Sequence, residues 1–340
     1  MVRSIVVRSS LAICALLLGG ASSTAHAEPR VLRLATPAPD GTAWARELNT
    51  FAREVEAGTG KQLRIKWYFG GIAGDEVEMA ERVRRGQLDG VASGGPMCER
   101  LAPSLRVLRV LGVATGHAEA AHVIGSLRAT LDDELGKHGF VYLAVSPLGP
   151  HILFSRTAIR SLSDLRHGFF WVWDQDDVLL TELKEFGVNV VPLTLDKAGR
   201  AYENGQIDGF VAPASVALAF QWSAQARFVT DLRMDMISGC VLIANRAFDS
   251  LPVDARSVMR AAAAKLQARF EDLGVTQDKQ LLGGLFAKQG VKTVEVSETF
   301  ASEFFAEARA VRDRLGAKLI APEILAHALG LLADYRATNR

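Results

Sequence analysis

The chain has 340 residues, and its 39 lysines and arginines almost balance its 38 aspartates and glutamates. Balanced charge gives no electrostatic reason to expect binding to nucleic acid or to an anionic membrane surface. With 49% hydrophobic residues, a chain of this length can build two lobes with separate cores.

The N-terminus has the pattern of an export signal. Arg3 and Arg8 form a basic region, residues 11–18 an apolar core, and Ala25-His26-Ala27 a cleavage motif. The apolar stretch is too short for a permanent anchor, and no later stretch is long and apolar enough to cross a membrane. We expect cleavage after Ala27 and a periplasmic protein. Its net charge would be −1, because the signal removes two arginines and no acid.

Strands and helices alternate along the first three quarters of the chain, which is typical of an α/β fold. The patterns predict strands at 31–36, 63–69, 91–93, 140–146, 151–155, 169–173, 188–192 and 236–245, and helices at 42–59, 76–85, 117–137, 177–186 and 196–204. Beyond Pro252 the pattern is mostly helical, at 255–273, 276–289, 298–315 and 322–337, with a short strand at 291–296.

One short phrase occurs twice, as Gly86-Gln87-Leu88-Asp89-Gly90 and as Gly205-Gln206-Ile207-Asp208-Gly209. Each copy follows a helical pattern and leads into a short apolar run. The first glycine suits the residue after a helix, which needs a positive φ. A helix–turn–strand unit used twice, one domain length apart, predicts two similar α/β lobes around a small molecule. We expect Asp89 and Asp208 to have equivalent structural roles.

Two cysteines, Cys98 and Cys240, remain after the signal is removed. They could pair in an oxidising compartment. We favour two unpaired, buried thiols, because a chain of this size does not need a covalent link.

Sequence motifs of common enzymes are absent: there is no P-loop, G-x-G-x-x-G, G-x-S-x-G, H-E-x-x-H or C-x-x-C. Asp174, Asp176 and Asp177 suggest a calcium site, but the EF-hand glycine and terminal glutamate are missing. A solvated turn that caps the helix starting near Asp177 explains them better. We expect no metal, no cofactor and no catalysis.

Several blocks resemble the solute receptors of TRAP (tripartite ATP-independent periplasmic) transporters. Gly70-Gly71-Ile72-Ala73-Gly74-Asp75-Glu76 with Gly86 to Asp89 is similar to the family's G-G-x-L-G-D-E … G-x-L-D. Ser163-Asp164-Leu165-Arg166 resembles its P-E-D-L-K-G, and residues 187–192 with 205–213 resemble G-x-x-x-x-P … G-x-x-D-G-x-x-x-P. Phe248-Asp249-Ser250-Leu251-Pro252 is similar to W-x-x-L-P.

The resemblance implies a two-lobed periplasmic-binding-protein fold (type II-like), with mixed sheets flanked by helices, crossing strands as a hinge and a long C-terminal helix bracing both lobes. We expect lobe I at 28–148 and 237–276, lobe II at 149–236 and 277–304, and C-terminal helices spanning the lobes at 305–340. The implied function is to capture a small organic solute between the lobes and deliver it to membrane permease subunits.

The chain departs from the family where the family binds carboxylates. The arginine of the central strand falls on Trp171, with Val172 as the other register. A second family arginine falls on His151, the asparagine of D-G-x-E-N-P on Ala212, and an acidic residue near Gly94 or Gly95. Indole offers one N–H donor and a large apolar face, so it cannot replace a guanidinium.

Strand alternation places Phe169, Trp171 and Trp173 on one face, which we expect to turn towards the cleft. The alternative is that Phe169 and Trp173 pack under neighbouring helices and only Trp171 meets the ligand. The departures therefore predict an apolar, aromatic or lipid-like solute whose polar end would meet His151, Ser93 or the Trp171 indole N–H. The expected ligand-binding residues are Thr36, Ser93, Gly94, His151, Phe169, Trp171, Trp173, Leu195 and Ala212.

Three alternatives stay open. The ligand could be an organic acid bound by a relocated arginine such as Arg100 or Arg227. The same receptor could present its ligand to a membrane signalling protein. An enzyme would need His151 to face Asp176 or Glu203 for acid–base work, and there is no nucleophile to support it.

Overall fold

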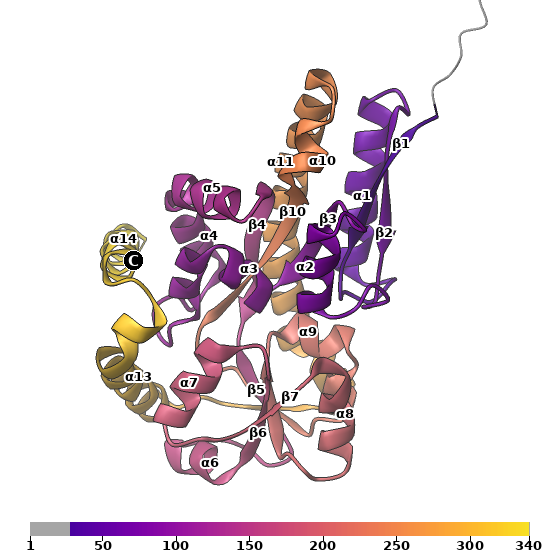
Figure 1. Ribbon diagram of the computed structural model, residues 1–340. Coiled ribbons are helices and arrows are strands. Elements are labelled where there is room, and N and C mark those ends of the chain that lie inside the picture. Colours follow the sequence, from indigo (N-terminus) through magenta and orange to yellow (C-terminus); the bar gives the residue numbers. More distant parts are fainter. Residues whose placement is uncertain (1–27, 340) are drawn as a thin grey trace, which may run out of the picture.

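The computed structural model describes residues 28–339, and the predicted cleavage after Ala27 lies outside this range. Two α/β lobes are stacked along the long axis of the molecule (Figure 1). Each lobe is built on one mixed sheet, and the strand orders are β2-β1-β3-β10-β4 and β11-β9-β5-β8-β6-β7. Within residues 28–339, no helix has the length and apolar character needed to cross a membrane.

The sheet of lobe I starts with three parallel strands. β1 (Arg30–Ala35) pairs with β2 (Leu63–Tyr68) and β3 (Gly90–Gly94), and β10 (Met236–Ala244) joins antiparallel between β3 and β4 (Phe140–Pro150). The helices of this lobe are α1 (Ala43–Gly58), α2 (Glu76–Arg84), α3 (Pro96–Leu101), η1 (Pro103–Arg109), α4 (His117–Ser126), α5 (Arg128–Lys137) and α10 (Asn245–Asp249). The stretch predicted as one helix at 117–137 is therefore two helices, separated at Leu127.

The sheet of lobe II repeats this arrangement. β6 (Phe169–Trp173) runs parallel to β7 (Asn189–Leu193) and β8 (Gly209–Ala212), and β5 (Ile152–Ser155) joins antiparallel beside β8. β9 (Phe228–Thr230) and β11 (Lys292–Val294) complete it. Its helices are α6 (Leu162–His167), α7 (Asp177–Glu185), α8 (Leu195–Glu203), α9 (Ala214–Ala219), η2 (Trp222–Ala224), the π-helical turn η3 (Leu281–Leu285) and α12 (Phe286–Lys288).

The repeated phrase occupies the same place in both lobes, in the turns α2–β3 and α8–β8. Gly86 (φ 74°) and Gly205 (φ 71°) have the positive φ predicted for a residue that ends a helix. The Asp89 carboxylate accepts a hydrogen bond from the backbone N–H of Arg33 at 2.9 Å, and that of Asp208 accepts one from Phe169 at 2.9 Å. Each aspartate thus fixes the amide of the neighbouring parallel strand, as predicted.

The chain crosses between the lobes at three places. Residue 151 separates β4 from β5, residues 231–235 separate β9 from β10, and the third crossing lies near the end of α11 (Val253–Gln280). The first two crossings are joined by backbone hydrogen bonds, from His151 N to Asp235 O (3.2 Å) and from Met234 N to His151 O (3.0 Å). These paired crossings agree with the predicted hinge, while the lobe boundaries themselves stay a prediction.

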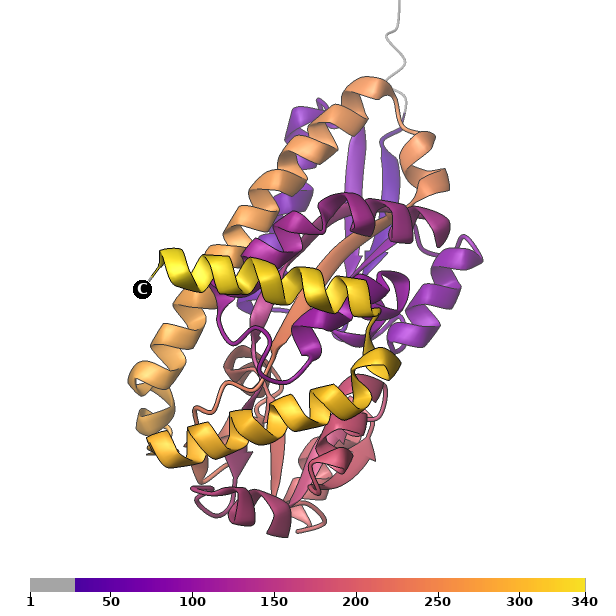
Figure 2. The same ribbon diagram turned by 90° about the vertical axis from the view of Figure 1, so that its left-hand side faces the viewer.

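Three long helices connect the lobes from outside. α11 runs along lobe I towards lobe II, α13 (Glu298–Leu319) lies across lobe II beside α7, and α14 (Pro322–Thr338) lies across lobe I beside α4 (Figure 2). Arg336 fastens α14 to α4 through the Glu119 carboxylate at 2.6 Å. The predicted helical brace is thus shared among three helices.

One predicted break in this region is wrong. We expected separate helices at 255–273 and 276–289, but α11 continues to Gln280. Gly274 lies where α11 packs against α4, and a Cβ there would come within 2.7 Å of the His117 ring. The glycine therefore permits close helix packing, and the helix deviates only at Gly284 (φ 141°).

Candidate functional site

A cavity of about 1040 Å³, including its solvent-open part, lies between the two lobes. The carboxyl ends of the parallel strands of both sheets reach it: Thr36 follows β1, Gly94 ends β3, Trp173 ends β6 and Ala212 ends β8. Ligand sites of open α/β sheets lie at these strand ends. Equivalent topologies turned towards each other therefore create one shared site.

Most of the cavity wall is apolar. Trp171 lines it but is only 3% exposed, because its ring packs edge-on against Trp222 with 4.7 Å between centroids. Other apolar side chains come from both lobes: Trp44, Leu48, Leu148, Phe270 and Ile237 from lobe I and its crossing strand, and Trp173, Leu179, Leu195, Val211, Val216 and Phe220 from lobe II. No arginine or lysine is among the described residues that line the cavity.

Glu76, at the start of α2, is a buried acid in this wall. Its carboxylate accepts a hydrogen bond from the backbone N–H of Met97 at 2.8 Å and contacts the Ser93 hydroxyl. Burial raises the pKa of Glu76 to about 8, against the opposing effect of these hydrogen bonds. At neutral pH the carboxyl group is therefore mostly protonated and adds no charge to the cavity.

His151 and Asp176 form the other ionisable part of the wall. His151 Nδ1 lies 2.8 Å from Asp235 Oδ1, and Asp176 caps α7 by accepting a hydrogen bond from Leu179 N at 3.1 Å. Behind them, the fully buried Arg109 donates to Asp176 Oδ2 at 2.6 Å and to Asp235 Oδ2 at 2.9 Å. Arg109 itself does not line the cavity.

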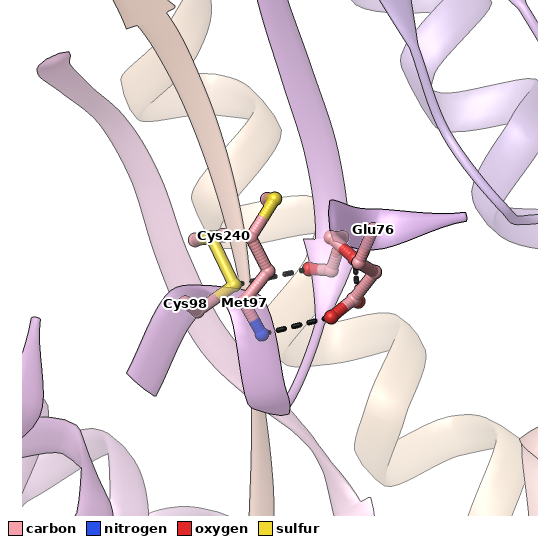
Figure 3. The surroundings of a disulfide bond; sticks show 5 residues. Glu76, Met97, Cys98 and Cys240 are labelled. Atoms are coloured by element: carbon pink, nitrogen blue, oxygen red, sulfur yellow. Dashed lines mark hydrogen bonds between the residues drawn. A yellow bond between two sulfur atoms is a disulfide. The ribbon is translucent and has the colours of Figure 1, made fainter. Parts of the chain in front are cut away.

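A disulfide joins Cys98 of α3 to Cys240 of β10, with 5.9 Å between their Cα atoms. The expectation of two unpaired thiols is therefore wrong. The two cysteines are 142 residues apart in the sequence, so the pairing could not be predicted locally. In the fold, β10 pairs with β3 and brings Cys240 next to α3. Figure 3 shows Met97, the neighbour of Cys98, pointing its amide at Glu76, so the disulfide fixes the helix that binds this acid.

Eight of the nine predicted ligand-binding residues line the cavity: Thr36, Ser93, Gly94, His151, Trp171, Trp173, Leu195 and Ala212. Phe169 does not, and its side chain is 51% exposed on the surface. It is the first residue of β6, whereas the cavity lies at the carboxyl end of that strand. Of the three aromatic residues expected on one face, Trp171 and Trp173 line the cavity, whereas Phe169 lies too far from the carboxyl end of the strand.

Two of the polar groups expected to bind the solute form hydrogen bonds within the protein instead. The Trp171 indole N–H donates to Leu193 O at 2.9 Å, and the Ser93 hydroxyl contacts Glu76. Of the groups expected to meet a polar ligand end, His151 is the one whose second nitrogen, Nε2, has no hydrogen-bond partner among the described residues.

The relocated arginines are not in the cavity wall. Arg100 donates to Gln175 O at 2.9 Å at the exposed seam between the lobes, and Arg227 does not line the cavity either. The predicted turn caps α7, and Asp174 and Asp177 are exposed as expected, but Asp176, which provides the cap, is buried. Within residues 28–339 no cluster of His, Cys, Asp and Glu could hold a metal ion.

The acid–base pair considered for an enzyme does not form. His151 contacts Asp235, Asp176 contacts Arg109, and Glu203 accepts a hydrogen bond from Gln225.

Arg109 and Glu76 were not predicted as functional residues. Glu76 belongs to the Gly70–Glu76 motif, which could have indicated it, while nothing in the local sequence distinguishes Arg109 from the exposed arginines around it.

Two lobes, paired crossings and a shielded cavity between strand ends define a receptor of the periplasmic-binding-protein class. Residues 34–319 match the family model of the bacterial extracellular solute-binding protein, family 7 (DctP), and the chain belongs to this family. It is a solute-binding protein and not an enzyme.

Two relatives are also described as solute-binding proteins. The chain is 27% identical to a solute-binding protein of Verminephrobacter eiseniae over 239 residues (66% of this chain and 69% of the relative). It is 23% identical to one of Chromohalobacter salexigens over 309 residues (87% of each chain).

The fold is similar to that of the sugar acid binding protein of Advenella mimigardefordensis in complex with galactonate (TM-score 0.83, 21% identity, covering 90% of this chain and 99% of that one). It is also similar to a TRAP periplasmic solute-binding protein of Haemophilus influenzae with bound L-gulonate (0.82, 17%, 89% and 99%). A Bordetella pertussis receptor binding pyroglutamic acid is a third example (0.80, 20%, 88% and 99%).

Proposed function

We propose that this protein is the extracytoplasmic receptor of a TRAP-type transporter, and that it captures a small, uncharged and largely apolar organic solute for delivery to a membrane permease. One observation carries the choice of solute: the cavity wall combines aromatic and aliphatic side chains with no arginine or lysine among the described residues.

The charges around the cavity disfavour an anion. A carboxylate is bound most strongly by a guanidinium that offers paired donors. Arg109, the arginine behind the wall, already forms ion pairs with Glu99, Asp176 and Asp235. Asp176 would repel an anionic ligand, and Glu76 is mostly neutral. A bound carboxylate would lose its hydration without gaining a guanidinium or ammonium partner in return.

The apolar wall can supply the affinity. Each Å² of buried apolar surface contributes roughly 25 cal/mol, so a solute with one or two rings gains several kcal/mol from burial alone. Micromolar binding corresponds to about 8 kcal/mol. His151 Nε2 is available to orient one polar group of such a solute.

A second candidate is an organic-acid receptor. The structural neighbours bound to galactonate, L-gulonate and pyroglutamic acid support it. In this chain the acid would have to be held without a lining arginine or lysine.

The same two-lobed receptor could instead present its ligand to a membrane sensor. A gene for a permease or for a sensor kinase next to this one would distinguish transport from signalling.

Titration calorimetry tests the choice of solute. The wild-type protein would be titrated with a series of neutral alkyl and aryl compounds and with short mono- and dicarboxylates, each at low and high salt. We expect binding of the neutral series with a negative heat-capacity change and little dependence on salt. Tight binding of a short carboxylate that weakens steeply with salt would contradict the proposal.

Trp171→Arg and Trp173→Phe form a matched pair for the same titration. The guanidinium introduced by Trp171→Arg would be buried without a partner whenever the lobes close on a neutral solute, and this costs several kcal/mol. We expect affinity for the neutral series to fall by a few orders of magnitude in this variant. Trp173→Phe keeps an aromatic wall and should lose about tenfold or less. Unchanged affinity in Trp171→Arg would remove Trp171 from the site.

A further inference from the structure

Arg109 is the last residue of η1 in lobe I, and no part of its side chain is exposed. Its three nitrogens each contact a different carboxylate. Nη1 lies 3.0 Å from Glu99 Oε1, Nη2 lies 2.6 Å from Asp176 Oδ2, and Nε lies 2.9 Å from Asp235 Oδ2. These contacts use three of the five N–H donors, and Nη2 also lies 3.4 Å from His151 Nδ1. Because the side chain is fully buried and does not line the cavity, a ligand cannot reach it directly.

The three carboxylates come from three parts of the molecule. Glu99 belongs to α3 of lobe I, Asp176 is the N-cap of α7 in lobe II, and Asp235 precedes β10 in a crossing between the lobes. One buried cation thus joins both lobes to the hinge. The Glu99 contact stays inside lobe I, while the Asp176 contact exists only when the lobes are together.

One of these partners lines the cavity and another contacts a residue that does. Asp176 lines it directly, and Asp235 lies 2.8 Å from His151 Nδ1, whose ring lines it. The carboxylates hold the pKa of Arg109 well above its usual value although burial acts against them. Arg109 therefore remains a cation, and it helps to fix the positions of His151 and Asp176 in the wall.

Two further arginines of lobe I make weaker contacts with lobe II around Arg109. Arg100 donates to Gln175 O at 2.9 Å and Arg106 to Asp177 Oδ2 at 3.3 Å, so arginines of lobe I contact three consecutive residues of lobe II. These outer contacts are exposed to solvent, where ion pairs contribute little. The buried contact of Arg109 is the one that resists screening.

We propose that Arg109 is a positioning residue for solute binding: through Asp176 and Asp235 it holds the lobes at their closed spacing and fixes His151 and Asp176 in the cavity wall without touching the solute. This inference rests on the proposed function, because it assumes that the solute binds in the cavity when the lobes are at this spacing. Opening would separate Arg109 from Asp176 and break this ion pair, while the contact with Glu99 inside lobe I can stay.

Two isosteric variants separate the interlobe contact from the contact inside lobe I. Asp176→Asn keeps an N-cap for α7 but removes the carboxylate of lobe II, and Glu99→Gln removes a carboxylate from the same guanidinium within lobe I. With the uncharged fluorescent probe N-phenyl-1-naphthylamine, we expect at least a tenfold loss of affinity in Asp176→Asn and less than a twofold change in Glu99→Gln. Arg100→Gln, at the exposed seam, should also stay within twofold.

A double-mutant cycle identifies the route of the effect, because Asp176 itself lines the cavity. If Asp176 acts through Arg109, the double variant Arg109→Gln/Asp176→Asn should bind the probe no more weakly than the poorer single variant. Arg109→Lys should recover part of the affinity. Should Arg109→Gln fail to fold, the comparison of Asp176→Asn with Glu99→Gln still shows whether the interlobe contact controls affinity. Independent, additive losses in the cycle would overturn the proposal.

Small-angle X-ray scattering gives a readout that needs no ligand. We expect a larger radius of gyration for Asp176→Asn than for the wild type and for Glu99→Gln. Equal values in all three proteins, or equal changes in both variants, would show that Arg109 serves only the stability of the fold. A wild-type protein that binds no uncharged compound would contradict the proposed function alone, since lobe spacing still tests Arg109.

Discussion

Glu76 is a carboxyl group that the folded protein holds mainly in its neutral form. Its pKa is about 8 in the folded state, against 4.5 for an ordinary glutamate, because the group is buried. Between these values the folded state binds more protons than the unfolded state, so the free energy of unfolding falls as pH rises. Burial of Glu99, whose pKa is raised to about 7, acts in the same direction.

This predicts a change in stability with pH for Glu76→Gln. The amide cannot ionise, so the variant should gain stability relative to the wild type by up to about 1.4 kcal/mol per pH unit between pH 5 and 8. Urea denaturation at several pH values measures it, with Glu78→Gln on the exposed face of the same helix as the control. A wild-type-to-variant difference that does not change with pH would mean that Glu76 is already ionised in the folded protein.

At the residue scale, sequence reasoning succeeded where a strand pattern fixed the direction of a side chain. The register of β6 placed Trp171 and Trp173 correctly on one face. Arg109 could not be predicted in the same way, since its role depends on Asp176 and Asp235, which the chain brings together only through its tertiary fold. Local sequence does not reveal that an arginine is buried.

At the scale of single elements, the two α–β turns show how one device serves both lobes. Asp89 and Asp208 each accept a hydrogen bond from the backbone amide of a neighbouring parallel strand, and neither lines the cavity. The helix–turn–strand repeat could be predicted from the sequence because it depends on local glycine and aspartate chemistry. The partner amides of Arg33 and Phe169 could not be predicted, because they belong to strands that are distant in the sequence.

Asp89→Ala and Asp208→Ala should each cost about 1–3 kcal/mol of stability, because each leaves a strand amide without its acceptor. Asp89 also pairs with Arg33 and Arg246, at 3.2 and 3.5 Å, so its variant should lose more. The asparagine variants keep an acceptor and should lose less. Chemical denaturation measures stability and calorimetry the affinity; lost affinity at unchanged stability would make these aspartates part of the ligand site.

The disulfide is the element-scale feature that sequence reasoning judged wrongly. It links α3 to β10 across 142 residues, and a loop of this length restricts the unfolded chain strongly, by about 4–5 kcal/mol in the chain-entropy model. The Cys98→Ala/Cys240→Ala variant should therefore unfold at markedly lower urea concentration. A reductant should lower the stability of the wild type but not that of the variant. A wild type indifferent to reductant would show that the bond contributes nothing.

At the scale of the whole molecule, the two-lobed fold was predictable because the repeat, the alternation of elements and the family resemblance all indicated it. The way the lobes meet was not. The seam consists of single contacts between distant segments, such as Arg109 with Asp176 and His151 with Asp235. The apolar cavity follows from the fold and from its side chains: strand ends of two like sheets face each other, and the described residues that line the space between them include no arginine or lysine.

Native mass spectrometry of the protein as it purifies from its own periplasm tests the central proposal most directly. The gentle ionisation keeps a bound solute in place, and fragmentation then releases it for identification. We predict an uncharged compound with an aromatic or aliphatic body and at most one or two polar groups. A sugar acid, a dicarboxylate or another small organic anion released in stoichiometric amount would contradict the proposal.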